Sequence, residues 1–192
     1  MVRADATQYE GWFYEGAGIY RHVWLNKYQN THIATDGIFA YSIVVNKKAT
    51  VTVETTVANE DDTVVNYSIN TYLLDKSGKI ISTAFEQKFS SGSSGEKISK
   101  QNIAVSNPNL WPLENPYLYK LVVDVKKAGK IIDTKILRFG IRTIEIKTNG
   151  VFLNGNYVKI HGTNNHQDHA GMGSALPDYL QYYRISLFSE GW

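Results

Sequence analysis

The feature that most constrains this chain is a regular alternation of apolar and polar residues between Thr50 and Ala58. Val51, Val53 and Val57 fall on one side of this segment, whereas Glu54 falls on the other. A period of two residues is typical of a β-strand with one buried and one exposed face. The segment therefore predicts a sheet that packs against another layer.

Similar alternating segments follow along most of the chain. The expected strands are Val65–Leu73, Lys79–Phe89, Glu96–Val105, Tyr117–Lys126 and Lys130–Ile146, the last being bent or shared between two sheets. Ala128-Gly129 is the expected hairpin turn, and Ser90–Gly95 is expected to be a surface loop rather than a domain boundary. Short strands separated by turns predict an all-β fold, an immunoglobulin-like antiparallel β-sandwich spanning residues 31–142.

The C-terminal residues have a different pattern. Val151–Ile160 is predicted to be a hairpin, because Asn154 and Gly155 both tolerate a positive φ. A polar, glycine-rich stretch without periodicity follows. Apolar residues at helical spacing then predict a helix that Ser174 caps and that has Pro177 in its first turn: Leu176, Leu180, Tyr183 and Leu187. We expect these elements to be a truncated α/β segment.

Composition and charge exclude several classes of function. The 192 residues carry 20 basic and 18 acidic side chains, so no strong field attracts nucleic acid or an anionic membrane. The absence of cysteine excludes disulfides and thiolate metal sites. The longest nearly apolar run, Ile38–Val45, is too short to span a bilayer, and no signal peptide is visible.

Three histidines, His161, His166 and His169, lie close together in the polar stretch. Their spacing matches no zinc motif, so we expect no metal site. The segment could be a polar loop with structural histidines. It could also bind a polyhydroxylated ligand, because consecutive side chains from Asn164 to Asp168 offer paired donors and acceptors.

No catalytic motif stands out elsewhere. The sequence has no nucleophile elbow, phosphate loop or dinucleotide fingerprint, and its glutamates are scattered. Trp12, Phe13 and Tyr14 form an aromatic cluster that suits a core slightly better than a sugar platform. Trp111, between two prolines, is expected to be a structural anchor.

Four segments in order resemble glycoside hydrolase family 2, and the last resembles its bacterial β-galactosidases. They are Trp12–Leu25, Asn107–Leu121 with its Asn-Pro-Asn-Leu-Trp-Pro motif, Arg138–Arg142, and Phe152–Asp168 followed by His169–Gly171 and Ser174–Asp178. The resemblance implies three parts. Residues 1–30 would end an N-terminal sugar-binding jelly roll, residues 31–142 would form the middle immunoglobulin-like domain, and residues 143–192 would begin a catalytic TIM barrel.

The same resemblance implies a retaining hydrolase that cleaves terminal β-galactosides with two glutamates located beyond residue 192. This chain would then be an inactive scaffold with no catalytic residue of its own. By the resemblance, His166 matches a histidine that reaches the sugar, and Asn165 and Asp168 are weaker candidates for the same pocket. The sequence does not decide whether the longer protein uses a divalent cation or what its oligomeric state is. Its compartment, periplasmic or secreted in a bacterium, is also undecided.

Two rival interpretations remain. The chain could be a noncatalytic carbohydrate-binding module, or an interaction domain of a surface protein, because fold alone does not define function. Within the family, a β-glucuronidase or a β-mannosidase is the nearest alternative for the substrate.

Overall fold

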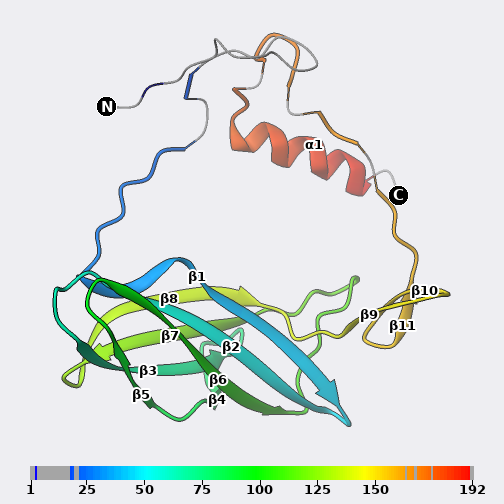
Figure 1. Ribbon diagram of the computed structural model, residues 1–192. Coiled ribbons are helices and arrows are strands. Elements are labelled where there is room, and N and C mark those ends of the chain that lie inside the picture. Colours follow the sequence, from blue (N-terminus) through cyan, green and yellow to red (C-terminus); the bar gives the residue numbers. More distant parts are fainter. Residues whose placement is uncertain are drawn as a thin grey trace. The chain divides into compact units, whose positions relative to one another are not determined.

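The computed structural model describes Arg3, Gly18, Ile19 and residues 22–162, 164–166, 168–173 and 175–190, without the side chains of 188–190. The chain forms two compact units (Figure 1). One is Lys27–Ile160, and the other combines Met1–Asn26 with His161–Trp192. The aromatic cluster Trp12–Tyr14, Gln167 and the expected cap Ser174 lie outside the described residues.

The larger unit is a sandwich of two antiparallel sheets. The first sheet has the order β1-β2-β6, formed by β1 (Thr31–Val45), β2 (Lys48–Asn59) and β6 (Gly95–Ser106). The second has β3 (Val65–Leu74), β7 (Tyr119–Lys127) and β8 (Lys130–Phe139), with β4 (Ile80–Thr83) and β5 (Gln87–Ser91) both paired to the outer edge of β3. This arrangement confirms the predicted all-β, immunoglobulin-like sandwich.

The core lies between the two sheets, where the alternation predicted it. Val51, Val53 and Val57 of β2 are fully buried, as are Ile69 and Leu73 of β3. The remaining buried core side chains come mainly from β6 and β7: Ile103, Val105, Tyr119, Leu121, Val123 and Val125. Burial of aliphatic side chains from both sheets is the main stabilising contribution to such a fold.

The prediction of a single strand over Lys79–Phe89 is wrong in one respect, because the segment is interrupted between Thr83 and Gln87. The buried side chain of Gln101 occupies the interruption. Its amide nitrogen donates to the carbonyl oxygens of Phe85 (2.9 Å) and Ile69 (3.2 Å), and its amide oxygen accepts from the Thr71 hydroxyl. A polar side chain from the other sheet therefore replaces ladder hydrogen bonds at this point.

Two other boundaries differ from the sequence prediction. The expected loop Ser90–Gly95 is shorter, because β5 continues to Ser91 and β6 already starts at Gly95. The expected strand Tyr117–Lys126 begins at Tyr119. Local composition marks the turn, but the length of each strand is set by pairing with its neighbour.

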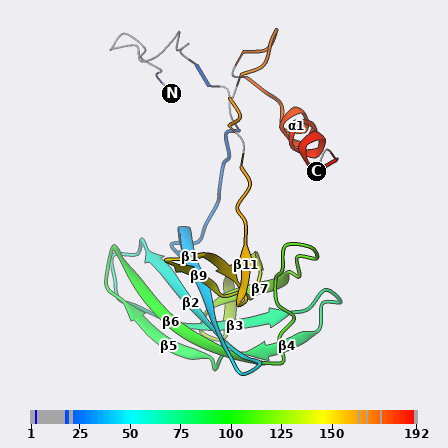
Figure 2. The ribbon, with the colours of Figure 1, turned by 90° about the vertical axis from the view of Figure 1, so that its right-hand side faces the viewer.

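The predicted long strand Lys130–Ile146 is indeed shared between two sheets. It is not one continuous strand, however: β8 ends at Phe139, and after residues 140–143 the chain continues as β9 (Ile144–Lys147). β9 pairs with β10 (Gly150–Leu153), and β10 pairs with β11 (Asn156–Val158). These three short strands lie beside the sandwich in Figure 1, and Figure 2 shows the molecule from their side, with β9 and β11 labelled. Asn154 and Gly155 have φ values of 54° and 81°, as the hairpin prediction requires.

Trp111 anchors the small sheet to the sandwich. Its backbone nitrogen donates to the Ile141 carbonyl (2.9 Å), and its carbonyl accepts from the Asn154 side chain (3.1 Å). The Arg142 guanidinium lies over its ring, 5.0 Å from the ring centre. The structural role expected for Trp111 is therefore visible in its contacts.

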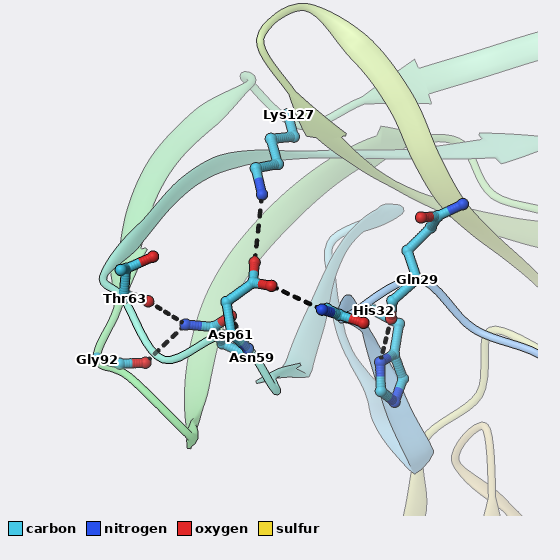
Figure 3. A network of polar contacts seen from close by, with 8 residues as sticks. Gln29, His32, Asn59, Asp61, Thr63, Gly92 and Lys127 are labelled. Carbon is cyan, nitrogen blue, oxygen red and sulfur yellow. Dashed lines mark hydrogen bonds and ion pairs between the residues drawn. The ribbon is translucent and has the colours of Figure 1, made fainter.

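A second polar network lies at the start of β1 (Figure 3). Asn59 donates from its amide to the carbonyl oxygens of Thr63 and Gly92, and its side-chain oxygen accepts from the backbone nitrogen of Asp61. The Asp61 carboxylate accepts from the Asn30 amide (2.7 Å) and lies 3.4 Å from the Lys127 ammonium. These contacts connect three turns with the segment that enters β1.

Within the smaller unit, α1 (Asp178–Glu190) confirms the predicted C-terminal helix. The helix begins after Pro177, rather than with this proline inside its first turn. Several of its large side chains are exposed: Tyr179, Tyr182, Tyr183, Ile185 and Leu187.

Candidate functional site

The predicted site residues Asn165, His166 and Asp168 lie in an irregular loop that precedes α1. All three are exposed. An irregular segment cannot satisfy its backbone groups through a helix or a sheet, so side chains and water must do so.

His166 and Asp168 form a pair within this loop. The distance from His166 Nδ1 to Asp168 Oδ1 is 2.9 Å, and more than half of the imidazole surface remains exposed. An ionised carboxylate can only accept, so the proton of this hydrogen bond resides on Nδ1. In the neutral imidazole, Nε2 is consequently the acceptor nitrogen.

Arg184 of α1 binds the same loop through its guanidinium group. Nη2 donates to the His166 carbonyl (3.1 Å) and to the side-chain oxygen of Asn165, and Nη1 donates to the Asp168 carbonyl (3.3 Å). The sequence analysis missed Arg184. Its position, one residue after the apolar Tyr183, carries no signal that links it to a loop some sixteen to nineteen residues earlier.

Of the other histidines of the stretch, His169 has a described place of its own. His169 belongs to a tight turn, in which its carbonyl accepts from the backbone nitrogens of Met172 and Gly173. In the part of the chain that the structure describes, no three His, Cys, Asp or Glu side chains form a group able to hold a metal ion.

A separate open pocket of about 280 Å³ lies in the larger unit. Loop residues 112–114 and the hairpin around Asn154-Gly155 form its walls. Among the described residues that line it, Glu114 is the single carboxylate. Retaining glycoside hydrolysis needs two carboxyl groups about 5–5.5 Å apart, so this pocket lacks the groups for that chemistry.

These features define an immunoglobulin-like β-sandwich domain with an α-helical flank that carries a polar loop. The chain belongs to the glycosyl hydrolases family 2, because the model of that family matches residues 31–142. The match covers more than half of the chain and coincides with the strands of the sandwich from β1 to β8.

Relatives with assigned names extend the similarity to both flanks. A β-glucuronidase of Formosa agariphila is 33% identical over 95% of this chain and 20% of its own length. A β-galactosidase of Bacteroides ovatus is 35% identical over 91% of this chain and 21% of its own length. The chain therefore spans about a fifth of these relatives.

A solved structure agrees with this assignment. A glycosyl hydrolase family 2 member from Bacteroides cellulosilyticus superposes with a TM-score of 0.84 at 30% identity, over 92% of this chain and 24% of the other. Among the described residues, no helix is both long and apolar enough to cross a membrane.

Proposed function

We propose that this chain is part of a retaining glycoside hydrolase that cleaves terminal β-galactosides. The observation that carries this proposal is continuous similarity to a protein named β-galactosidase over 91% of the chain, on both sides of the sandwich. In this proposal residues 31–142 are the scaffold domain. Residues 1–30 end a sugar-binding jelly roll, and residues 143–192 begin the catalytic barrel.

His166 is the proposed sugar contact of this chain, with Asn165 and Asp168 beside it. The pairing of His166 with Asp168 supports this role, because a proton on Nδ1 leaves Nε2 as the acceptor nitrogen of the neutral imidazole. Asp168 would then orient His166, whereas Asn165 would fix the loop through Arg184.

The 192-residue chain alone should be inactive. Retaining hydrolysis requires one carboxylic acid as proton donor and a second carboxylate as nucleophile on the two sides of the glycosidic bond. In this proposal both belong to later barrel strands. Without them, the chain lacks the positioned groups that lower the barrier.

The test compares this chain with a longer protein that continues through the barrel, on chromogenic β-galactoside, β-glucuronide, β-mannoside and β-glucoside. We expect only the longer protein to cleave, with the highest kcat/KM on the β-galactoside. His166→Ala should lower that kcat/KM, whereas Lys97→Ala, at an exposed position of β6, serves as the control. Turnover by the purified 192-residue chain that survives His166→Ala would contradict the proposal.

A β-glucuronide is the second candidate substrate, because the relative from Formosa agariphila is named β-glucuronidase. A preference of the longer protein for the β-glucuronide in the same panel would establish it. If no β-glycoside is cleaved, a binding module becomes the better interpretation. Calorimetry of the 192-residue chain with galactosides would then show millimolar or tighter binding.

A further inference from the structure

We propose that Arg184 is a positioning residue, which holds His166 and Asp168 in the arrangement in which His166 meets the sugar. This inference rests on the function proposed above. It concerns a residue of α1 that contacts the loop and acts through His166, rather than a group that touches the substrate.

The geometry of the guanidinium group carries the inference. Its two terminal nitrogens reach acceptors on three residues: the carbonyl oxygens of His166 and Asp168 and the side-chain oxygen of Asn165. A guanidinium is planar and presents five N–H donors in a fixed fork, so it fixes several acceptors relative to one another. A lysine ammonium is a compact charge on a flexible stem and cannot impose that arrangement.

The loop needs such a partner because its residues have no strand or helix geometry of their own. Arg184 binds the carbonyl oxygens of both His166 and Asp168. Fixing these two backbone positions brings Asp168 Oδ1 within 2.9 Å of His166 Nδ1. The carboxylate then sets the orientation of the imidazole and the nitrogen that carries its proton.

A helix is a suitable base for this contact. α1 spans thirteen residues, and its backbone hydrogen bonds hold Arg184 on a regular frame. Side chains that are supported by rigid elements position a binding group more accurately than the loop could alone. In this proposal α1 holds Arg184, and Arg184 holds the backbone of the loop. The loop backbone in turn places Asp168 against His166.

The first test uses the 192-residue chain and does not depend on activity. Backbone ¹⁵N relaxation is compared for the unmodified chain, Arg184→Gln, Arg184→Lys and the control Arg138→Gln, which removes an exposed arginine of β8. In both Arg184 variants we expect the order parameters of Asn165, His166 and Asp168 to fall from about 0.85 to below about 0.6. The control should leave them unchanged. Unchanged values in Arg184→Gln would overturn the proposal.

The second test uses the longer protein and separates positioning from general stability. Arg184→Lys should lower kcat/KM on the preferred glycoside by about 10- to 100-fold, since small displacements of a contact group have effects of this size. In a His166→Ala background the same change should cost less than about 2-fold, because the two residues act as one unit. Equal losses in both backgrounds would show a merely structural role and overturn the proposal. If the longer protein cleaves no glycoside, the proposed function fails, while the relaxation experiment still decides whether Arg184 holds the loop.

Discussion

Gly140 lies directly against the indole ring of Trp111. A Cβ atom added at Gly140 would stand 2.8 Å from Trp111 Cδ1 and 2.9 Å from Cγ. Carbon atoms in proteins do not approach this closely without a shift of one partner. Trp111 cannot shift easily, because its backbone nitrogen and carbonyl are hydrogen-bonded to Ile141 and Asn154. The glycine therefore lets the indole pack at the point where β8 ends.

Gly140→Ala should consequently destabilise the protein by about 1–3 kcal/mol, the usual cost of overpacking a well-filled site. Urea unfolding followed by tryptophan fluorescence would measure the change. Gly92→Ala is the matched control, because nothing lies within 4 Å of a Cβ at that position. A loss below about 0.5 kcal/mol in Gly140→Ala would contradict the steric interpretation.

Gln101→Met should lower the free energy of unfolding by about 2–4 kcal/mol. Methionine has a similar length but leaves the carbonyls of Ile69 and Phe85 and the Thr71 hydroxyl without their partner, and each buried unpaired group is costly. Chemical denaturation would give the difference. Gln87→Met, at an exposed position of β5, should change stability by less than about 0.5 kcal/mol.

Ala128→Asn should stabilise the hairpin between β7 and β8 by up to about 1 kcal/mol. Ala128 has φ of 51° and Gly129 has φ of 78°, and a left-handed conformation is unfavourable for alanine but tolerated by asparagine. Thermal unfolding should show a higher Tm for this variant. Ala128→Val should lower the Tm, because a β-branched side chain tolerates a positive φ poorly. The same sign for both variants would refute the backbone explanation.

Asp61 should contribute to acid sensitivity. The hydrogen bond from Asn30, with a smaller contribution from Lys127, holds the pKa of Asp61 below its ordinary value of 3.8. A carboxyl group whose pKa is lowered by folding stabilises the protein above its unfolded pKa, and this contribution disappears as the pH falls through the folded value. Unfolding measured from pH 7 to pH 2 should therefore show a loss of stability below about pH 4.

Asp61→Asn should make that acid-induced loss smaller and lower stability at pH 7. Asn30→Ala should reproduce much of the effect, because it removes the donor instead of the acceptor. The double variant should cost less than the sum of the two single variants. An acid dependence that is identical in all four proteins would exclude a role for this contact.

Much of the sandwich could be predicted from the sequence, because alternation and turn chemistry are local properties. The burial of Val51, Val53 and Val57 could be predicted from the two-residue alternation of apolar and polar side chains. The hairpin at Asn154-Gly155 follows from the positive φ that both residues accept. The division of Lys79–Phe89 could not be predicted, since its cause is Gln101, which reaches in from a strand of the other sheet.

The candidate site shows the same division between local and tertiary information. The sequence by itself determined the two sheets, the polar loop and the helix that follows, and it drew attention to His166, Asn165 and Asp168. Only the tertiary structure decided that Arg184 binds all three residues and that Trp111 packs against Gly140. The physical reason is that backbone preference and hydrophobic periodicity act between near neighbours. The partner of a polar group or an aromatic ring, by contrast, is chosen by the folded chain that surrounds it.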